Sequence, residues 1–85
     1  MKNELSWKEK YVLSLKESLT LKDIMMLRNC GMPTAREIRK NAIKYCLENN
    51  LEYSTKSVPS EAVHHATGKN IEYYYQKYSM LKKIL

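Results

Sequence analysis

Phenylalanine is absent from this 85-residue sequence, and glycine, proline and cysteine each occur only twice. Seven tyrosines, five methionines and one tryptophan must therefore supply much of the bulk of a core. Because a tyrosine hydroxyl needs water or a hydrogen-bond partner, we expect many of these rings at the margin of the core. Both glycines are isolated, so the sequence contains no glycine-rich phosphate-binding loop.

Long apolar runs are also missing. No stretch approaches the ~20 apolar residues that a membrane-spanning helix needs, and the charged segment after Met1 predicts no signal peptide. Cys30 and Cys46 are the only cysteines, too few for the disulfide framework of a small secreted domain. The sequence therefore predicts a cytoplasmic protein with two free thiols.

Clusters that carry metal or catalytic chemistry are not evident either. The two cysteines are far apart in sequence, whereas zinc ligands come in close pairs. His64 and His65 are adjacent, so on a helix their rings point about 100° apart. Asp23, the one aspartate, is better placed as a helix cap, and no carboxylate pair stands out. We expect no catalytic residue, no metal and no cofactor, and hence no enzyme.

Positive charge is what the chain has in excess. Fifteen Lys and Arg residues stand against nine Asp and Glu, giving a net charge of +6 and a pI near 9.4. This balance favours a polyanionic partner, with nucleic acid ahead of an anionic membrane surface. With 44% hydrophobic and 28% charged residues, the composition is ordinary for one folded domain.

Two adjacent helices form the clearest pattern in the sequence. Thr20, with Asp23 three residues later, is typical of a capping box at a helix start. This helix is expected to end near Gly31 in left-handed geometry, and Pro33 then opens a second helix that runs to Glu48. Two helices joined by a short turn are the parts of a DNA-binding helix–turn–helix. An αα-hairpin with a solvated basic face is the alternative.

The second of these helices carries most of the local charge. Between Arg28 and Lys44 there are five basic residues and one acid, Glu37. Guanidinium and ammonium groups bind phosphates and guanine edges, and a hydroxyl at a helix N-terminus helps to hold a phosphate. The predicted DNA-binding residues of this helix are Thr34, Arg36, Arg39, Lys40 and Lys44.

The segments that flank the two helices are less distinctive. Within residues 1–17, the stretch from Tyr11 to Leu15 fits either a short strand or a helical turn, because the apolar period does not separate the two. Residues 51–58 alternate and predict a short strand or an extended loop. Within them, the hydroxyl-rich stretch around Lys56 would be the wing of a winged domain, with Lys56 near the DNA backbone or minor groove. A plain surface loop is the alternative.

A further helix opens at Pro59 and ends at Gly68, and Asn70 caps a last helix. In that helix, apolar side chains recur at spacings of three and four, which forms a two-heptad seam. The seam packs within the chain, or it pairs two subunits. The residues expected at such a homodimer contact are Ile71, Tyr74, Tyr78 and Leu81.

These elements predict a mainly α fold, a small winged helix-turn-helix-like domain with a short β or extended wing and a C-terminal helix. We expect an N-terminal arm over residues 1–17 and a helix–turn–helix core with its wing over 18–67. An amphipathic C-terminal helix over 68–85 completes the single domain.

The layout also resembles a known family. A Trp-x-x-x-Tyr start, the stretch LTLKDIMML, the glycine turn, the basic helix and the step VPSEAV after the wing together resemble the excisionase-like proteins of phages and mobile elements. These are winged relatives of the MerR-type DNA-binding domain. The resemblance covers roughly residues 7–67; a long second helix and the tyrosine-rich last helix depart from the usual pattern. It implies DNA contacts by Arg36, Arg39 and Lys40 on the groove-facing helix and by Lys56 in the wing.

The expected function is therefore a double-stranded DNA-binding accessory protein of a mobile element or phage. It would act in DNA recombination as an excisionase-type architectural factor, or in transcription regulation as a small regulator, and not at a membrane. The alternative is a small basic protein-interaction module, a phage-type inhibitor or adaptor that binds an acidic protein surface, since Met and Tyr suit interfaces. A recombinase or another protein as a further partner is also left open.

Overall fold

The computed structural model describes residues 4–84, with side chains described through Leu81. It is mainly helical, with a short antiparallel sheet, and is compatible with a small winged helix-like domain, which confirms the predicted fold class. The elements are α1 (Trp7–Ser14), β1 (Ser18–Thr20), α2 (Leu21–Arg28), α3 (Met32–Glu48), β2 (Ser57–Pro59), α4 (Ser60–Thr67) and α5 (Ile71–Ile84).

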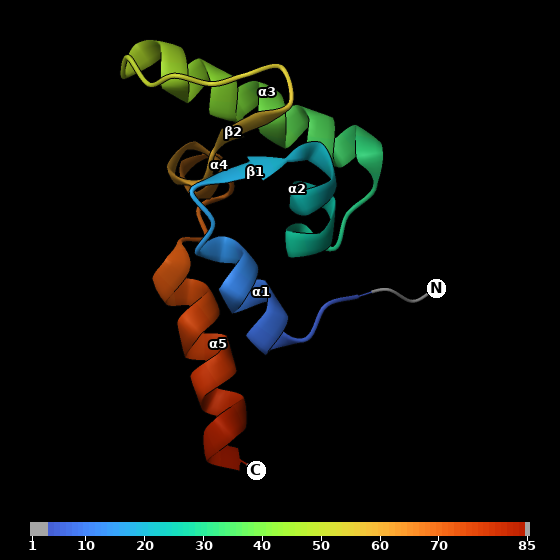
Figure 1. The fold of residues 1–85 in the computed structure, drawn as a ribbon. Coiled ribbons are helices and arrows are strands. Elements are labelled where there is room, and N and C mark those ends of the chain that lie inside the picture. Colours follow the sequence, from blue (N-terminus) through green and yellow to red (C-terminus); the bar gives the residue numbers. More distant parts are fainter. Residues whose placement is uncertain (1–3, 85) are drawn as a thin grey trace.

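The elements are arranged along one long axis, and the molecule measures 42 × 28 × 17 Å. Helix α3 lies across one end, α1 and α5 form the other end, and the sheet and α4 lie between them (Figure 1). Helix α3 packs on α2 and α4, whereas α1 packs mainly on α5. The basic helix and the tyrosine-rich helix are therefore at opposite ends.

The sheet joins two segments that are far apart in sequence. Strands β1 and β2 are antiparallel, with Leu19 opposite Val58, and both of these side chains are fully buried. Strand β2 occupies only the end of the region predicted as strand or loop, and residues 51–56 are a loop. Because β2 pairs with the segment before α2, the segment predicted as a wing or a surface loop is a loop rather than a hairpin.

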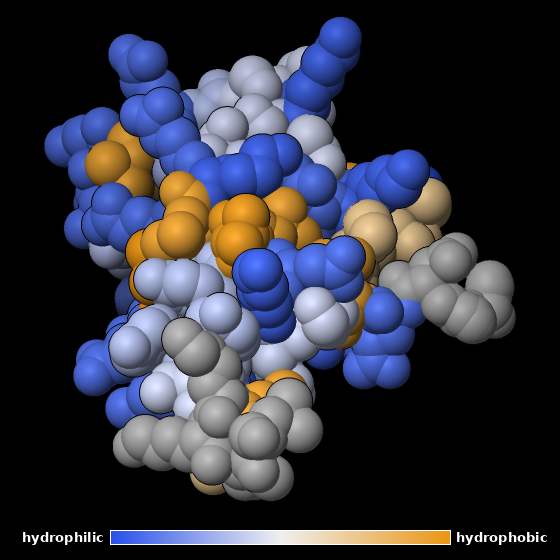
Figure 2. All heavy atoms as spheres, turned by 60° about the horizontal axis from the view of Figure 1, so that its bottom comes forward, coloured by the Kyte–Doolittle hydropathy of each residue, from blue (hydrophilic) through white to orange (hydrophobic). Residues whose placement is uncertain are grey.

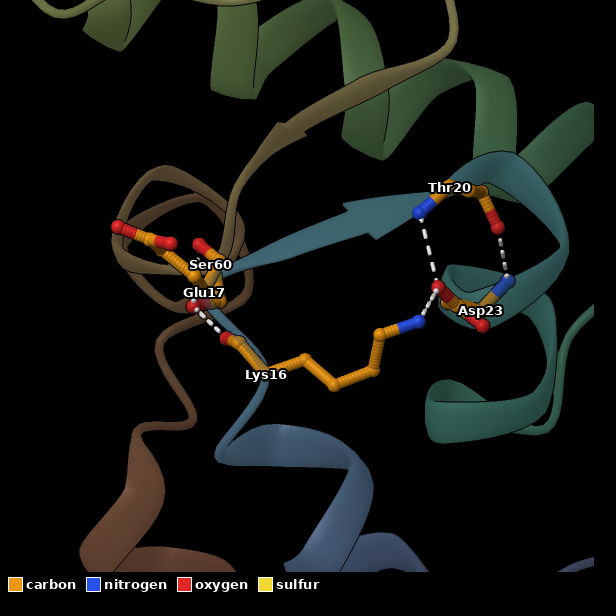
Figure 3. A network of polar contacts seen from close by, with 5 residues as sticks. All are labelled: Lys16, Glu17, Thr20, Asp23 and Ser60. Carbon is orange, nitrogen blue, oxygen red and sulfur yellow. Dashed lines mark hydrogen bonds and ion pairs between the residues drawn. The ribbon is translucent and has the colours of Figure 1, made fainter.

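A polar network holds the corner between α1, α2 and α4 (Figure 3). The Ser60 amide donates to the Glu17 carbonyl oxygen at 2.9 Å, and the Ser60 hydroxyl donates to the carbonyl oxygens of Lys16 and Glu17. The Lys16 ammonium lies 2.9 Å from the Asp23 carboxylate. These contacts fix where α2, and hence the turn into α3, begins relative to the rest of the molecule.

The predicted capping box at the start of α2 is present. Asp23 N donates to the Thr20 hydroxyl at 3.1 Å, and Thr20 N donates to the Asp23 carboxylate at 3.0 Å. Burial raises the pKa of Asp23, but the hydrogen bonds from Lys16 and Thr20 and the Lys16 charge outweigh it, so the pKa lies below 3.8.

The prediction that Gly31 takes the left-handed conformation at the end of this helix was wrong by two positions. Asn29 takes the left-handed conformation, with φ 51°, because asparagine tolerates this region better than most side chains. Gly31 has an extended backbone, with φ −80°, and serves as the N-cap of α3. The second helix begins at Met32 and ends at Glu48, as predicted to within a residue or two.

The ambiguous N-terminal segment forms helix α1. Ser6 and Glu9 make a reciprocal capping box, with Glu9 N 3.2 Å from the Ser6 hydroxyl and Ser6 N 2.8 Å from the Glu9 carboxylate. This Ser-x-x-Glu signature selects the helix over the strand. The arm is thus an integral helix, packed on α5; its first three residues lie outside the described part.

The core lies where α2, α3, α4 and the sheet meet. Cys46 is buried and Cys30 is half-buried, and both thiols are free. Tyr74 brings α5 into this core, because it is fully buried and its hydroxyl accepts a 3.1 Å hydrogen bond from the Arg28 guanidinium. The other core side chains are Leu19, Ile24, Leu27, Ala35, Ala42, Val58, Ala62 and Val63.

The junction from α4 to α5 follows the sequence prediction. Gly68 ends α4 in left-handed geometry with φ 75°, and the Asn70 side chain accepts a 3.0 Å hydrogen bond from Tyr73 N at the start of α5. The buried ring of His64 lies between α4 and α1, with Nε2 3.2 Å from the Ser14 carbonyl oxygen. Among the described helices, none is long and apolar enough to span a bilayer.

Candidate nucleic-acid interface

Helix α3 has one buried side and one exposed basic side. Ala35 and Ala42 are fully buried against the core. Arg36, Lys40 and Lys44 follow one another at intervals of four residues, so they line up along the other side of the helix. All three are exposed. The sequence thus places small residues where helices approach and long cations where α3 faces solvent.

A shallow depression of about 470 Å³ lies where α3 meets the start of α2 and the loop before β2. Its cations come from two separate parts of the chain, three from α3 and one from the loop. Leu21 and Ile43 contribute its apolar lining. The structure therefore brings together four of the six residues predicted to bind DNA, namely Arg36, Arg39, Lys40 and Lys56.

Arg39 has a contact that sequence reasoning did not anticipate. Its Nη2 donates to the carbonyl oxygen of Ser54 at 3.0 Å and to that of Thr55 at 2.9 Å. The side chain is half-buried, whereas Arg36 and Lys40 are exposed. One guanidinium nitrogen thus joins the loop to α3, and this holds the loop beside the exposed cations.

The loop is also fixed from within. The Ser54 hydroxyl accepts hydrogen bonds from Lys56 N at 3.2 Å and from Ser57 N at 3.0 Å. Ser54 N donates to the Ser57 carbonyl oxygen at 3.0 Å. Serine side chains commonly close turns in this way. The backbone of Lys56 is therefore held in place while its side chain remains exposed.

The two remaining predicted residues lie outside the depression. Thr34 is exposed in the first turn of α3, and Lys44 lies two turns beyond Arg36. The first turn of α3 carries no acid, and its N-cap, Gly31, offers no side chain to the free amides. The positive end of the helix macrodipole therefore adds to the positive charge at this corner.

Within residues 4–81, no acidic side chain forms an ion pair with the basic side of α3. Among the described residues, the ion pairs join Lys10 to Glu4 and Lys16 to Asp23, and none involves the cations of α3 or of the loop. The exposed Glu37 is the acid on α3 that lies nearest in sequence to Arg36. The site can attract and hold an anion without first breaking an internal salt bridge.

Three residues of the depression were missed from sequence: Leu21, Ile43 and Thr55. Leu21 lies on α2 and Ile43 on α3, and nothing in the sequence indicates that either side chain reaches the basic surface. Thr55 lies in the predicted wing and had no distinguishing signal. Within the described part of the chain, no three His, Cys or acidic side chains are placed to hold a metal ion.

The comparisons with known proteins found no relative of this chain. No family model, no curated protein and no solved structure matches the chain.

Proposed function

We propose that this protein binds double-stranded DNA through the exposed side of α3 and the loop of residues 51–56. The observation that carries the proposal is the convergence of Arg36, Arg39, Lys40 and Lys56 on one depression. These cations belong to the second helix of a helix–turn–helix and to the loop that follows it. A helix entering the major groove with a basic loop beside the backbone is a recurrent way of binding a duplex.

The residues of this surface have two proposed roles in binding DNA. Arg36 and Lys40, exposed in the first half of α3, suit contact with base edges or phosphates. Lys44, Thr34 and Lys56 surround them and suit the phosphate backbone. Because much of the affinity then comes from phosphate neutralisation, binding should weaken steeply with salt.

The biological role we propose is that of an accessory factor of a mobile element or phage. An excisionase-type architectural protein and a small transcriptional regulator both fit a short chain whose described fold is mainly helical and compatible with a small winged helix-like domain. The resemblance of the turn and of the VPSEAV step to excisionase-like proteins supports this assignment. It requires no covalent chemistry from the chain.

A direct test is binding to a labelled duplex taken from the DNA flanking the gene, measured by fluorescence anisotropy. The double variant Arg36→Ala/Lys40→Ala should bind at least about tenfold more weakly. The matched control, Lys8→Ala/Lys77→Ala, removes the same charge from exposed positions on α1 and α5 and should bind nearly as the wild type does. Equal affinities of wild type and α3 variant would refute the proposal.

A further inference from the structure

The depression between α3 and the loop has an apolar lining that phosphate binding does not require. Leu21, at the start of α2, and Ile43, on α3, line it together with the four cations and Thr55. Both apolar side chains are half-buried, so each packs partly on the core and partly faces the depression. Phosphate oxygens gain nothing from such neighbours, because they bind polar donors. The lining therefore indicates a ligand that carries carbon surface beside its negative charge.

The spacing along α3 places Ile43 on the same side of the helix as the cations of the depression. Ile43 follows Arg36 by seven residues and Lys40 by three, and these spacings align side chains along one helix face. Leu21 comes from another element, because it is the first residue of α2. The fold thus assembles the apolar pair from two segments, as it does the cations.

The larger apolar surface of the protein lies elsewhere, at the end formed by α1 and α5. Figure 2 turns that end toward the reader and shows a band of apolar side chains between hydrophilic ones. The predicted seam along α5 is only partly internal, because Tyr74 is fully buried whereas Ile71 and Leu81 are exposed. Tyr74 therefore packs within the chain, and a homodimer contact by the other residues stays a prediction. The depression on α3 lies at the opposite end (Figure 1), so its apolar lining does not extend this band.

The concave shape of the site indicates which part of a duplex meets this lining. Base edges, including the thymine methyl group, lie inside the grooves and are reached by a protruding helix, whereas the sugar–phosphate strand protrudes between the two grooves. A depression between a helix and a loop thus fits one strand, with the helix in the adjacent groove. Each nucleotide of that strand offers a phosphate and, beside it, a deoxyribose that lacks the 2′-hydroxyl of ribose. Cations beside an apolar pair match this combination.

We propose that the depression holds one sugar–phosphate strand and that Leu21 and Ile43 contact its deoxyribose carbons, which makes them specificity determinants for DNA over RNA. Arg36, Lys40 and Lys56 bind the flanking phosphates. A ribose at this position would place its 2′-hydroxyl against carbon that offers it no hydrogen bond, which is unfavourable. The proposal rests on the proposed function, because it assigns a role within the same DNA-binding surface.

Single ribonucleotide substitution tests the proposal with the full chain. A labelled duplex that the wild type binds is prepared with one ribonucleotide at each position in turn, and its Kd is measured by fluorescence anisotropy. Ribose at the positions that face the pair should raise the Kd about tenfold and should change it little elsewhere. A 2′-fluoro nucleotide, which favours the same sugar pucker without a hydroxyl, should leave the Kd near that of the all-DNA duplex. Equal losses for both substitutions, or no loss at any position, overturn the proposal.

Variants of the apolar pair connect the ribose effect to these side chains. Ile43→Thr and Leu21→Gln each offer the 2′-hydroxyl a polar partner, so the tenfold effect of ribose should fall to about two- or threefold. The ratio of the two Kd values within one variant is compared, so a general loss of affinity cancels. Ile38→Thr is the matched control, because Ile38 is also half-buried on α3 but does not line the depression; it should keep the full effect. Circular dichroism verifies folding, and a full ribose effect in both folded pair variants overturns the proposal.

The outcomes separate this proposal from the proposed function. Binding that Arg36→Ala/Lys40→Ala weakens, but that no ribonucleotide affects, refutes the role of the apolar pair and leaves the DNA-binding surface standing. Failure to bind any duplex refutes both. Replacing thymine by uracil removes one methyl group from a base. A loss of affinity on that replacement that Ile43→Thr abolishes, without a ribose effect, would show contact with a base and would also overturn the proposal.

Discussion

The Arg39 guanidinium and the Thr55 carbonyl oxygen lie 2.9 Å apart, and this contact joins the basic helix to the loop that follows it. The same nitrogen also donates to Ser54, so one side chain on α3 holds two successive loop residues. The sequence predicted Arg39 as a direct DNA contact. In the structure it positions the loop that carries Lys56, which gives the candidate interface a fixed shape.

The first prediction concerns this contact. Arg39→Ala should lower the free energy of opening that protects the Lys56 and Ser57 amides from hydrogen exchange by about 1–2 kcal/mol. The reason is that the substitution removes two charge-assisted hydrogen bonds that anchor the loop. NMR-detected exchange of the free protein gives this value. Arg36→Ala removes the same charge without touching the loop, and should leave both amides as they were. If the two variants exchange alike, Arg39 does not hold the loop.

A second prediction concerns the buried contact between α2 and α5. Tyr74→Phe should lower the free energy of unfolding by about 1 kcal/mol, because Arg28 loses its hydrogen-bond acceptor. Tyr74→Ala should lower it by about 3–5 kcal/mol, because a fully buried ring is replaced by a cavity. Urea denaturation measures both, with Tyr53→Phe in the exposed loop as a control within about 0.5 kcal/mol of wild type. Equal losses for Phe and Ala would contradict this account.

The third prediction is a dependence of stability on pH. Burial lowers the pKa of His64 below 6.5, and the hydrogen bond with the Ser14 carbonyl oxygen offsets this only in part. The folded chain therefore binds fewer protons at His64 than the unfolded chain does. The free energy of unfolding should fall as the pH drops below about 6.5, and this loss should end once the pH is below the pKa of the folded state.

Urea denaturation at several pH values between 7.5 and 5 tests this dependence. His64→Gln keeps a side-chain donor for the Ser14 carbonyl but does not titrate, so its stability should vary much less over this range. His65→Gln, at an exposed neighbouring position, should keep the wild-type dependence. If His64→Gln has the same pH profile as the wild type, His64 is not the group responsible.

Local signals in the sequence predicted much of the fold. The pair Thr20 and Asp23, Gly68 and Asn70 each marked a helix end that the structure contains. These signals work because capping depends on residues within one turn of each other. The left-handed residue predicted at Gly31 lies at Asn29, which shows the limit of these local signals. Both residue types tolerate a left-handed backbone, and only the path of the chain selects between them.

Contacts between distant segments could not be predicted in this way. The pairing of Leu19 with Val58 joins strands 39 positions apart, and both strands are too short for their pattern to specify a partner. The bonds from Arg39 to the loop likewise depend on how α3 is placed against β2. The cations of the candidate interface were therefore predictable as basic residues of one helix and of the loop after it, whereas the positioning role of Arg39 and the apolar lining were not.

The salt dependence of duplex binding tests the central claim most directly. If α3 and the loop neutralise phosphates, a plot of log K against log salt concentration should be steep for the wild type. For Arg36→Ala/Lys40→Ala the slope should become shallower by about one for each phosphate contact that is lost. The control Lys8→Ala/Lys77→Ala should retain the wild-type slope. Identical slopes for all three proteins would contradict the account, because charge at α3 would then contribute no more than charge at the opposite end.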